Sequence, residues 1–132
     1  MTPKEILRRY KKIAVVGISN DRTRASNGVS RYMLGQGYEI IPVNPGITEF
    51  EGIPAVPDLA SVPGEIEIVN IFRRPEYVPA IVEAAIAKGA KAIWMQQGIV
   101  NEEAAERARQ AGLAVVQDRC IFVEHMAQKH ED

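Results

Sequence analysis

The chain has 132 residues, of which 46% are hydrophobic and 25% are charged, and its formal net charge is −1. This length suits one domain, residues 1–132, and the composition is that of an ordinary globular protein. The balanced charge argues against nucleic acid as the partner, because such binders usually carry a basic excess over the whole domain, and it favours a small ligand.

The first half of the chain predicts two helices that alternate with two strands. A capping box at Thr2 and Glu5 begins the first helix. The continuous apolar run at residues 13–16 is typical of a strand buried on both faces. Gly37 supplies a left-handed stop for the second helix, and Pro42 lacks an amide donor, which predicts a strand near a sheet edge. The predicted elements are helices over 2–11 and 26–36 and strands over 13–16 and 40–43.

The second half continues this alternation. Residues 44–64 are rich in proline and glycine, so we expect only a short extra edge strand at residues 50–53. Pro75 opens a helix that ends before Gly89, and Asn101 caps the next helix. The remaining predicted elements are strands over 66–72, 92–95 and 113–116 and a final helix after Asp118.

Strands and helices that alternate at roughly 25-residue intervals predict an α/β fold. We expect a doubly wound, Rossmann-like parallel sheet of five main strands between two layers of helices. In such sheets, ligands bind at the carboxyl ends of the strands, where the winding direction reverses. The loops that begin at Gly17, Asn44, Phe72 and Gln96 should therefore line the site.

The sequence also bears on the compartment of the protein. Residues 1–12 are charged and lack the apolar stretch of a signal peptide, and no segment approaches the ~20 apolar residues of a membrane span. The single cysteine, Cys120, has no second cysteine to form an internal disulfide with. We expect a cytoplasmic protein that does not bind a membrane.

The first of these loops, residues 17–28, offers groups that suit a phosphate. It is not a GxGxxG motif, because Ser19 occupies the place of the second glycine. A helix start with free amides and the hydroxyls of Ser19 and Ser26 can nonetheless hold an anion, and Arg22 and Arg24 add positive charge. The alternative is a solvated polar turn with a capping serine. The position directly after the first buried strand favours the ligand site.

The second loop argues against NAD. Dinucleotide sites carry a carboxylate at the end of the second strand, where it binds the ribose hydroxyls. This chain has Asn44, Pro45 and Gly46 there, so nothing rejects a phosphorylated ribose. The loop is therefore compatible with NADP and with coenzyme A (CoA), which carries a 3′-phosphate. The alternative is that these residues form a simple Pro-Gly turn without a binding role.

The third and fourth loops add polar groups. Arg73 and Arg74 stand at a helix start, where they oppose the helix dipole, so they indicate an anionic ligand or a protein partner unless they are merely exposed. Gln96 and Gln97 precede Gly98 and can hydrogen-bond an amide chain such as pantetheine. Trp94, which lies inside an apolar strand, is expected to pack in the core.

Five motifs in this order resemble the family of small stand-alone CoA-binding domains. That family is similar to the N-terminal CoA-binding domain of the α subunit of succinyl-CoA synthetase, and the match covers nearly the whole chain. The motifs are Gly-Ile-Ser at 17–19, Ile-Pro-Val-Asn-Pro at 41–45, Ile-Phe-Arg-Arg-Pro at 71–75, Trp-Met-Gln-Gln-Gly at 94–98 and Asp-Arg-Cys-Ile-Phe-Val-Glu-His at 118–125.

The resemblance implies that the cofactor is CoA or an acyl-CoA. The synthetases place a lysine a few residues after the Pro-Gly turn of strand two, whereas this chain has Ile47 there. We hypothesise that Arg22 or Arg24 supplies the missing charge. By the same resemblance, Gly17, Ile18 and Ser19 meet the diphosphate, Asn44 and Pro45 lie near the nucleoside, and Phe72, Arg73, Arg74, Gln97 and Gly98 follow the rest of the cofactor.

We expect no autonomous catalysis. Related synthetases use a phosphorylated histidine on a second domain and a nucleotide-grasping domain, and 132 residues cannot include these. The two histidines, His125 and His130, lie near the C-terminus, and no Cys/His cluster has the spacing of metal ligands, so no metal is expected.

Cys120 leaves two interpretations open. It follows the last strand near a helix start, where it could face the pantetheine thiol and form a mixed disulfide with CoA. The usual behaviour of free cysteines favours the other interpretation, an inert residue that packs behind Ile121 and Phe122.

Three functions remain. The first is a CoA-binding module with a carrier, sensing or regulatory role. The second is a small NADP-binding redox enzyme or sensor. The third is a partner subunit that completes an acyl-CoA synthetase in trans.

Overall fold

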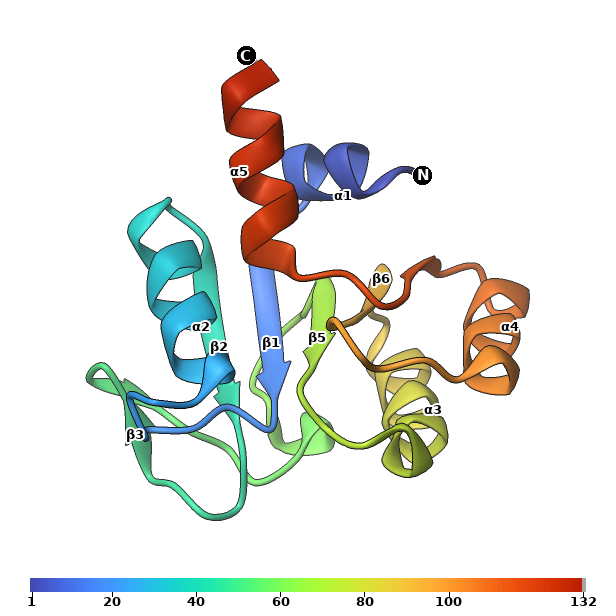
Figure 1. The fold of residues 1–132 in the computed structure, drawn as a ribbon. Coiled ribbons are helices and arrows are strands. Elements are labelled where there is room, and N and C mark those ends of the chain that lie inside the picture. The colour runs from blue at the N-terminus through green and yellow to red at the C-terminus, as the bar shows by residue number, and fades with distance from the viewer. Residues whose placement is uncertain (132) are drawn as a thin grey trace.

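The computed structural model describes residues 1–131 and has the predicted α/β architecture (Figure 1). The predicted domain extends to residue 132, which lies outside the described residues. Its five-stranded sheet has the order β2-β1-β5-β6-β7, and every neighbouring pair is parallel, which confirms the doubly wound fold. The strands are β1 (Lys12–Val16), β2 (Glu39–Val43), β5 (Ile68–Ile71), β6 (Ala92–Met95) and β7 (Ala114–Val116).

Helices cover both faces of the sheet, as expected for three layers (Figure 1). Because side chains alternate along a strand, β1 sends Ile13 into the core under α1, α2 and α5 and Ala14 into the core under α3 and α4. Trp94 is fully buried, which confirms that it packs in the core. The helices are α1 (Pro3–Arg9), α2 (Ala25–Gly35), α3 (Val78–Lys88), α4 (Glu102–Gln110) and α5 (Ile121–Glu131).

The prediction for residues 50–53 was wrong. The strands β3 (Glu49–Phe50) and β4 (Ile53–Pro54) form a separate antiparallel hairpin instead of an extra edge strand. Positive φ angles at Glu51 and Gly52 make its turn, and the fully buried Phe50 anchors it to the core. A short 3₁₀ helix, η1 (Leu59–Ser61), follows.

Several boundaries also differ from the prediction. The helix predicted to start at Pro75 begins as a 3₁₀ turn, η2 (Pro75–Tyr77), and α3 follows it directly. The first helix ends at Arg9 because Tyr10 is extended. The strand predicted over 66–72 pairs only over Ile68–Ile71. Pro42 lies in the edge strand β2, as predicted, because an edge strand tolerates a missing amide donor.

The winding reverses between β1 and β5, since β2 lies on one side of β1 and β5 on the other. The chain leaves β1 toward α2 and leaves β5 toward α3, which cover opposite faces. Such a divergence opens a crevice at the carboxyl ends of the strands. No helix in the described part of the chain is long and apolar enough to cross a membrane.

Candidate functional site

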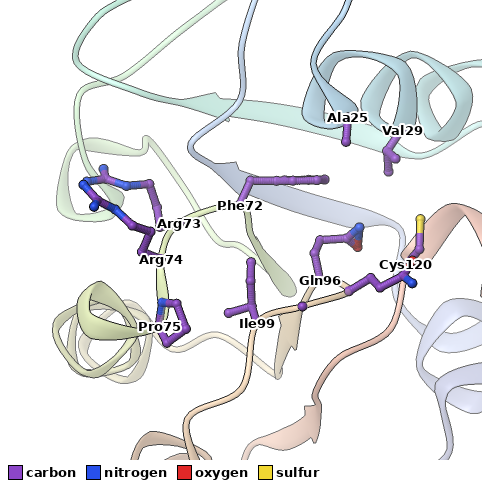
Figure 2. Close-up of a pocket in the computed structure, with 11 residues that line it drawn as sticks. Ala25, Val29, Phe72, Arg73, Arg74, Pro75, Gln96, Ile99 and Cys120 are labelled. Atoms are coloured by element: carbon purple, nitrogen blue, oxygen red, sulfur yellow. The ribbon is translucent and has the colours of Figure 1, made fainter.

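A cavity of about 500 Å³ lies at the carboxyl ends of the central strands (Figure 2). Its walls come from the start of α2, from the loops after β5 and β6, and from the segment before α5. Figure 2 shows the Phe72 ring and the Gln96 side chain extending into this space from neighbouring strands. The lining residues are Ala25, Val29, Phe72, Arg73, Arg74, Pro75, Gln96, Gln97, Gly98, Ile99 and Cys120.

A second cavity, of about 360 Å³, opens at the N-terminus of α2. It shares Phe72 and Ala25 with the first, so the two cavities are adjacent. The first amides of a helix have no carbonyl partner within the helix, and the first turn of α2 contains no acidic residue. The cavity therefore suits an anion. It is lined by Gly17, Ser19, Arg24, Ala25, Ser26 and Phe72.

A third cavity, of about 270 Å³, lies on the α3 side of the sheet and shares Arg73 with the first. Its wall includes Pro45 from the loop after β2 and Tyr77 from the start of α3. The Arg73 guanidinium carbon lies 4.4 Å from the centre of the Tyr77 ring, a cation–π distance. Much of the remaining wall is apolar, and it includes Leu59 and Ile81.

The two candidate arginines of the first loop differ in their surroundings. Arg24 lines the cavity at the N-terminus of α2. Arg22 instead lies 4.0 Å from a carboxylate oxygen of Glu51 in the β3–β4 turn. Ile47, which stands where the synthetases have a lysine, packs against the core under α2. Arg24 is therefore the better placed of the two to meet an anion.

The first loop is held in shape by its own hydrogen bonds. Asp21 Oδ1 accepts from the Thr23 amide at 2.9 Å and from the Thr23 hydroxyl at 2.7 Å. These hydrogen bonds lower the pKa of Asp21, and the charge of Arg24 contributes in the same direction. The Asp21 amide in turn donates to the Ser19 hydroxyl. The loop thus has a defined conformation without a ligand.

Asn44 joins two of the loops. Its Nδ2 donates to the carbonyl oxygen of Ile18 at 2.8 Å, and its Oδ1 accepts from the Gly46 amide at 2.8 Å. The Ile18 side chain is fully buried, so only its backbone can face a ligand. Of the predicted site residues, Arg22, Ile18 and Asn44 do not line these three cavities, whereas the others do.

Gln96 is one of the two glutamines that the sequence indicates as partners for an amide chain, although the family resemblance points only to Gln97. Gln96 is 4% exposed, and its Oε1 accepts from the Ile121 amide at 2.9 Å. Its Nε2 makes no hydrogen bond within residues 1–131. Because Gln96 lines the cavity, this amide is available to donate to a polar group of a ligand there. The apolar lining residues Val29 and Ile99 were missed because they carry no polar signal in the sequence.

Neither histidine lies in these cavities. His125 is buried, and its Nδ1 is 2.8 Å from the Tyr32 hydroxyl. Among the described residues, no group of three or more histidine, cysteine or acidic side chains could hold a metal ion.

This arrangement agrees with the comparison to known families. Residues 11–126 match the family described as "CoA binding domain". The chain belongs to the CoA-binding domain family. The matched residues include the whole sheet and the lining of all three cavities. The resemblance found in the sequence is therefore confirmed.

Relatives of this CoA-binding domain fall into two groups. The uncharacterized protein YneT of Bacillus subtilis is 48% identical over 126 residues, covering 96% of this chain and 93% of YneT. A hypothetical protein from Pyrococcus horikoshii has a solved structure with a TM-score of 0.93 and 41% identity, covering 98% of this chain and 93% of that one. The α subunit of an ADP-forming acetate–CoA ligase II from Pyrococcus furiosus is 26% identical, covering 84% of this chain but only 27% of the subunit.

Proposed function

We propose that this chain binds CoA, or an acyl-CoA, across the three adjacent cavities. The observation that carries the proposal is that a helix N-terminus suited to phosphate adjoins a cavity with an available amide donor, with Phe72 in the wall of both. CoA has the matching sequence of chemical groups: an anionic diphosphate followed by a pantetheine arm with amide groups. Membership of the CoA-binding domain family supports the same ligand.

Each part of the cofactor has a proposed place. The diphosphate lies at the N-terminus of α2, where backbone amides, Ser26 and Arg24 can donate to it. The pantetheine arm follows Phe72 into the cavity of about 500 Å³, where its carbonyl groups can accept from Gln96 Nε2. The nucleoside lies between Pro45 and Tyr77, where Arg73 is close to a 3′-phosphate.

We propose that the chain holds CoA without transforming it. The groups that line the cavities are mainly apolar side chains, arginines, glutamines and hydroxyls, which bind and orient a ligand. A general acid or base would need a group that titrates near neutral pH within reach of the thioester. The resulting role is that of a carrier, a sensor or a regulatory module for CoA.

A second candidate follows from one comparison. The chain aligns with about a quarter of the length of the acetate–CoA ligase subunit, so it corresponds to one part of that larger protein. The chain could therefore act in trans as the CoA-binding part of a synthetase. Copurification with an acid–CoA ligase subunit, together with ligase activity that depends on both chains, would favour this alternative.

Isothermal titration calorimetry with CoA, 3′-dephospho-CoA, NAD and NADP tests the proposal. We expect CoA to bind tightly, 3′-dephospho-CoA to bind more weakly, and the two nicotinamide nucleotides not to bind. Binding of NADP without binding of CoA would overturn the proposal and favour the redox enzyme or sensor.

A further inference from the structure

Cys120 lines the cavity proposed for the pantetheine arm, and its thiol faces that cavity. Cys120 is the single cysteine of the sequence, and it is partly buried in the wall of this cavity. Figure 2 shows its sulfur pointing away from the backbone of its own segment, on the side where α2 carries Val29. The thiol is therefore accessible from the cavity although it packs against the core under α2 and α5.

The segment that carries Cys120 is fixed by contacts on both sides. The indole Nε1 of Trp94 donates to the carbonyl oxygen of Arg119 at 2.8 Å. On the other side, the Cys120 carbonyl oxygen accepts from the Glu124 amide at 3.0 Å in the first turn of α5. The backbone on both sides of the thiol is thus held in place at the cavity wall.

The neighbouring Gln96 gives independent evidence for a ligand at this end of the cavity. Gln96 Oε1 accepts from the amide of Ile121, the residue after Cys120, so the carboxamide is oriented by the same segment. Its Nε2 has no hydrogen-bond partner within residues 1–131, although Gln96 as a residue is only 4% exposed, and it lines the cavity. A pantetheine amide that accepts from Nε2 would bring the end of the arm close to Cys120.

We propose that Cys120 forms a mixed disulfide with CoA by exchange with CoA disulfide bound in this cavity. This inference rests on the proposed CoA-binding function. The Cys120 sulfur, as the thiolate, attacks one sulfur of CoA disulfide, and a bond between Sγ and that sulfur forms while the original S–S bond breaks. The departing CoA thiolate takes up the proton that the Cys120 thiol released. CoA disulfide is the oxidant, and any free thiol in excess reverses the reaction.

The selectivity of this exchange comes from binding. A disulfide held beside the thiol reacts at a high effective concentration, whereas a small disulfide that the cavity does not bind reacts only by collision. The chain would thereby retain CoA covalently under oxidising conditions and release it when thiols are restored. This behaviour is that of a thiol-responsive CoA carrier.

The test compares the rates at which CoA disulfide and hydroxyethyl disulfide modify the full chain, followed by intact-protein mass spectrometry. We expect an adduct of one CoA moiety that forms at least about tenfold faster than the hydroxyethyl adduct and disappears with dithiothreitol. Cys120→Ser should form no adduct, whereas Arg22→Gln, whose side chain lies outside the three cavities, should form the adduct at the wild-type rate.

Equal rates with the two disulfides, or no CoA adduct on a chain that binds CoA in the calorimeter, would overturn the thiol exchange and leave the proposed function standing. Absence of CoA binding in the calorimeter would overturn the proposed function, and this inference with it.

Discussion

A Cβ atom on Gly17 would lie 2.5 Å from the carbonyl oxygen of Phe72, so the loops after β1 and β5 meet backbone to backbone. Gly17 also has a φ of +90°, a backbone conformation that residues other than glycine rarely adopt. The Phe72 amide donates to the carbonyl oxygen of Val16 at 2.9 Å and extends this contact. The two loops that form the proposed phosphate end of the site are therefore joined at Gly17.

We expect Gly17→Ala to lower the free energy of unfolding by at least about 1–3 kcal/mol, the cost of strained backbone alone. It should also weaken CoA binding, because the two loops must separate. Urea denaturation and calorimetry measure the two effects. Gly28→Ala is the matched control: apart from its chain neighbours and the backbone of its own helix, no described atom lies within 4 Å of its Cβ position. Alanine in α2 should stabilise the chain by about 0.5–1 kcal/mol. Equal stability changes in the two variants would contradict the close contact.

Arg24 and Arg22 should contribute unequally to CoA affinity. Arg24 lines the cavity at the N-terminus of α2, whereas Arg22 lies beside Glu51. We expect Arg24→Gln to weaken CoA binding about tenfold and to reduce its dependence on salt, since a charge-assisted contact with phosphate is lost. Arg22→Gln serves as the control and should leave the affinity nearly unchanged. Unchanged affinity in both variants would rule out an arginine in place of the missing lysine.

Asn44 should matter to both stability and binding through its two hydrogen bonds. Replacement by alanine leaves the Ile18 carbonyl oxygen and the Gly46 amide without this partner. We expect Asn44→Ala to lower the free energy of unfolding by about 1–2 kcal/mol and to weaken CoA binding, because the loop after β1 loses its support. Asn44→Asp keeps the acceptor for Gly46 but places a carboxylate oxygen against the Ile18 carbonyl oxygen, so its losses should be at least as large. Thermal unfolding and calorimetry would show no loss in either variant if the loops were independent.

The buried His125 should make stability depend on pH. Burial lowers the pKa of His125 from its ordinary 6.5, and the charges of Lys11 and Lys129 lower it further. The folded chain therefore favours the neutral imidazole, and below the ordinary pKa the unfolded chain binds more protons. The stability that this group contributes is present above pH 6.5 and is lost as the pH falls toward the lowered pKa of the folded state.

Urea denaturation from about pH 7 to about pH 5 measures this dependence. The decline in the free energy of unfolding should be steeper for the wild type than for His125→Gln, whose side chain does not titrate. Carboxylates contribute equally to both proteins, so they cancel in the comparison. Parallel pH profiles would show that the imidazole ionises as readily in the folded chain as in the unfolded one.

The sequence was sufficient to predict the sheet and the edge at which the candidate cavities lie. Buried apolar runs end at Gly17, Phe72 and Gln96, and parallel strands place their carboxyl ends together, so these loops had to meet. The β3–β4 hairpin was missed because its strands have two residues each, too short for a periodic pattern. The start of α3 was misplaced because proline at residue 75 suits a 3₁₀ turn as well as a helix.

The individual contacts were harder to predict. Asn44 reaches Ile18, 26 residues away, and the Gln96 carboxamide reaches Ile121, 25 residues away. Such contacts depend on how the strands are ordered in the sheet, which a local pattern does not contain. For the same reason, the sequence left Arg22 and Arg24 equivalent, whereas the position of the β3–β4 turn beside Arg22 separates them.

The most direct test of the central claim is an NMR titration of the ¹⁵N-labelled chain with CoA. We predict that the amides that shift belong to the loop after β1, the first turn of α2, the loops after β5 and β6, and the segment around Cys120. The amides at the end of α5 and in the β3–β4 hairpin should not shift. Shifts confined to another surface, such as the groove beside β2 that contains Leu34 and Ile53, would contradict the proposed site.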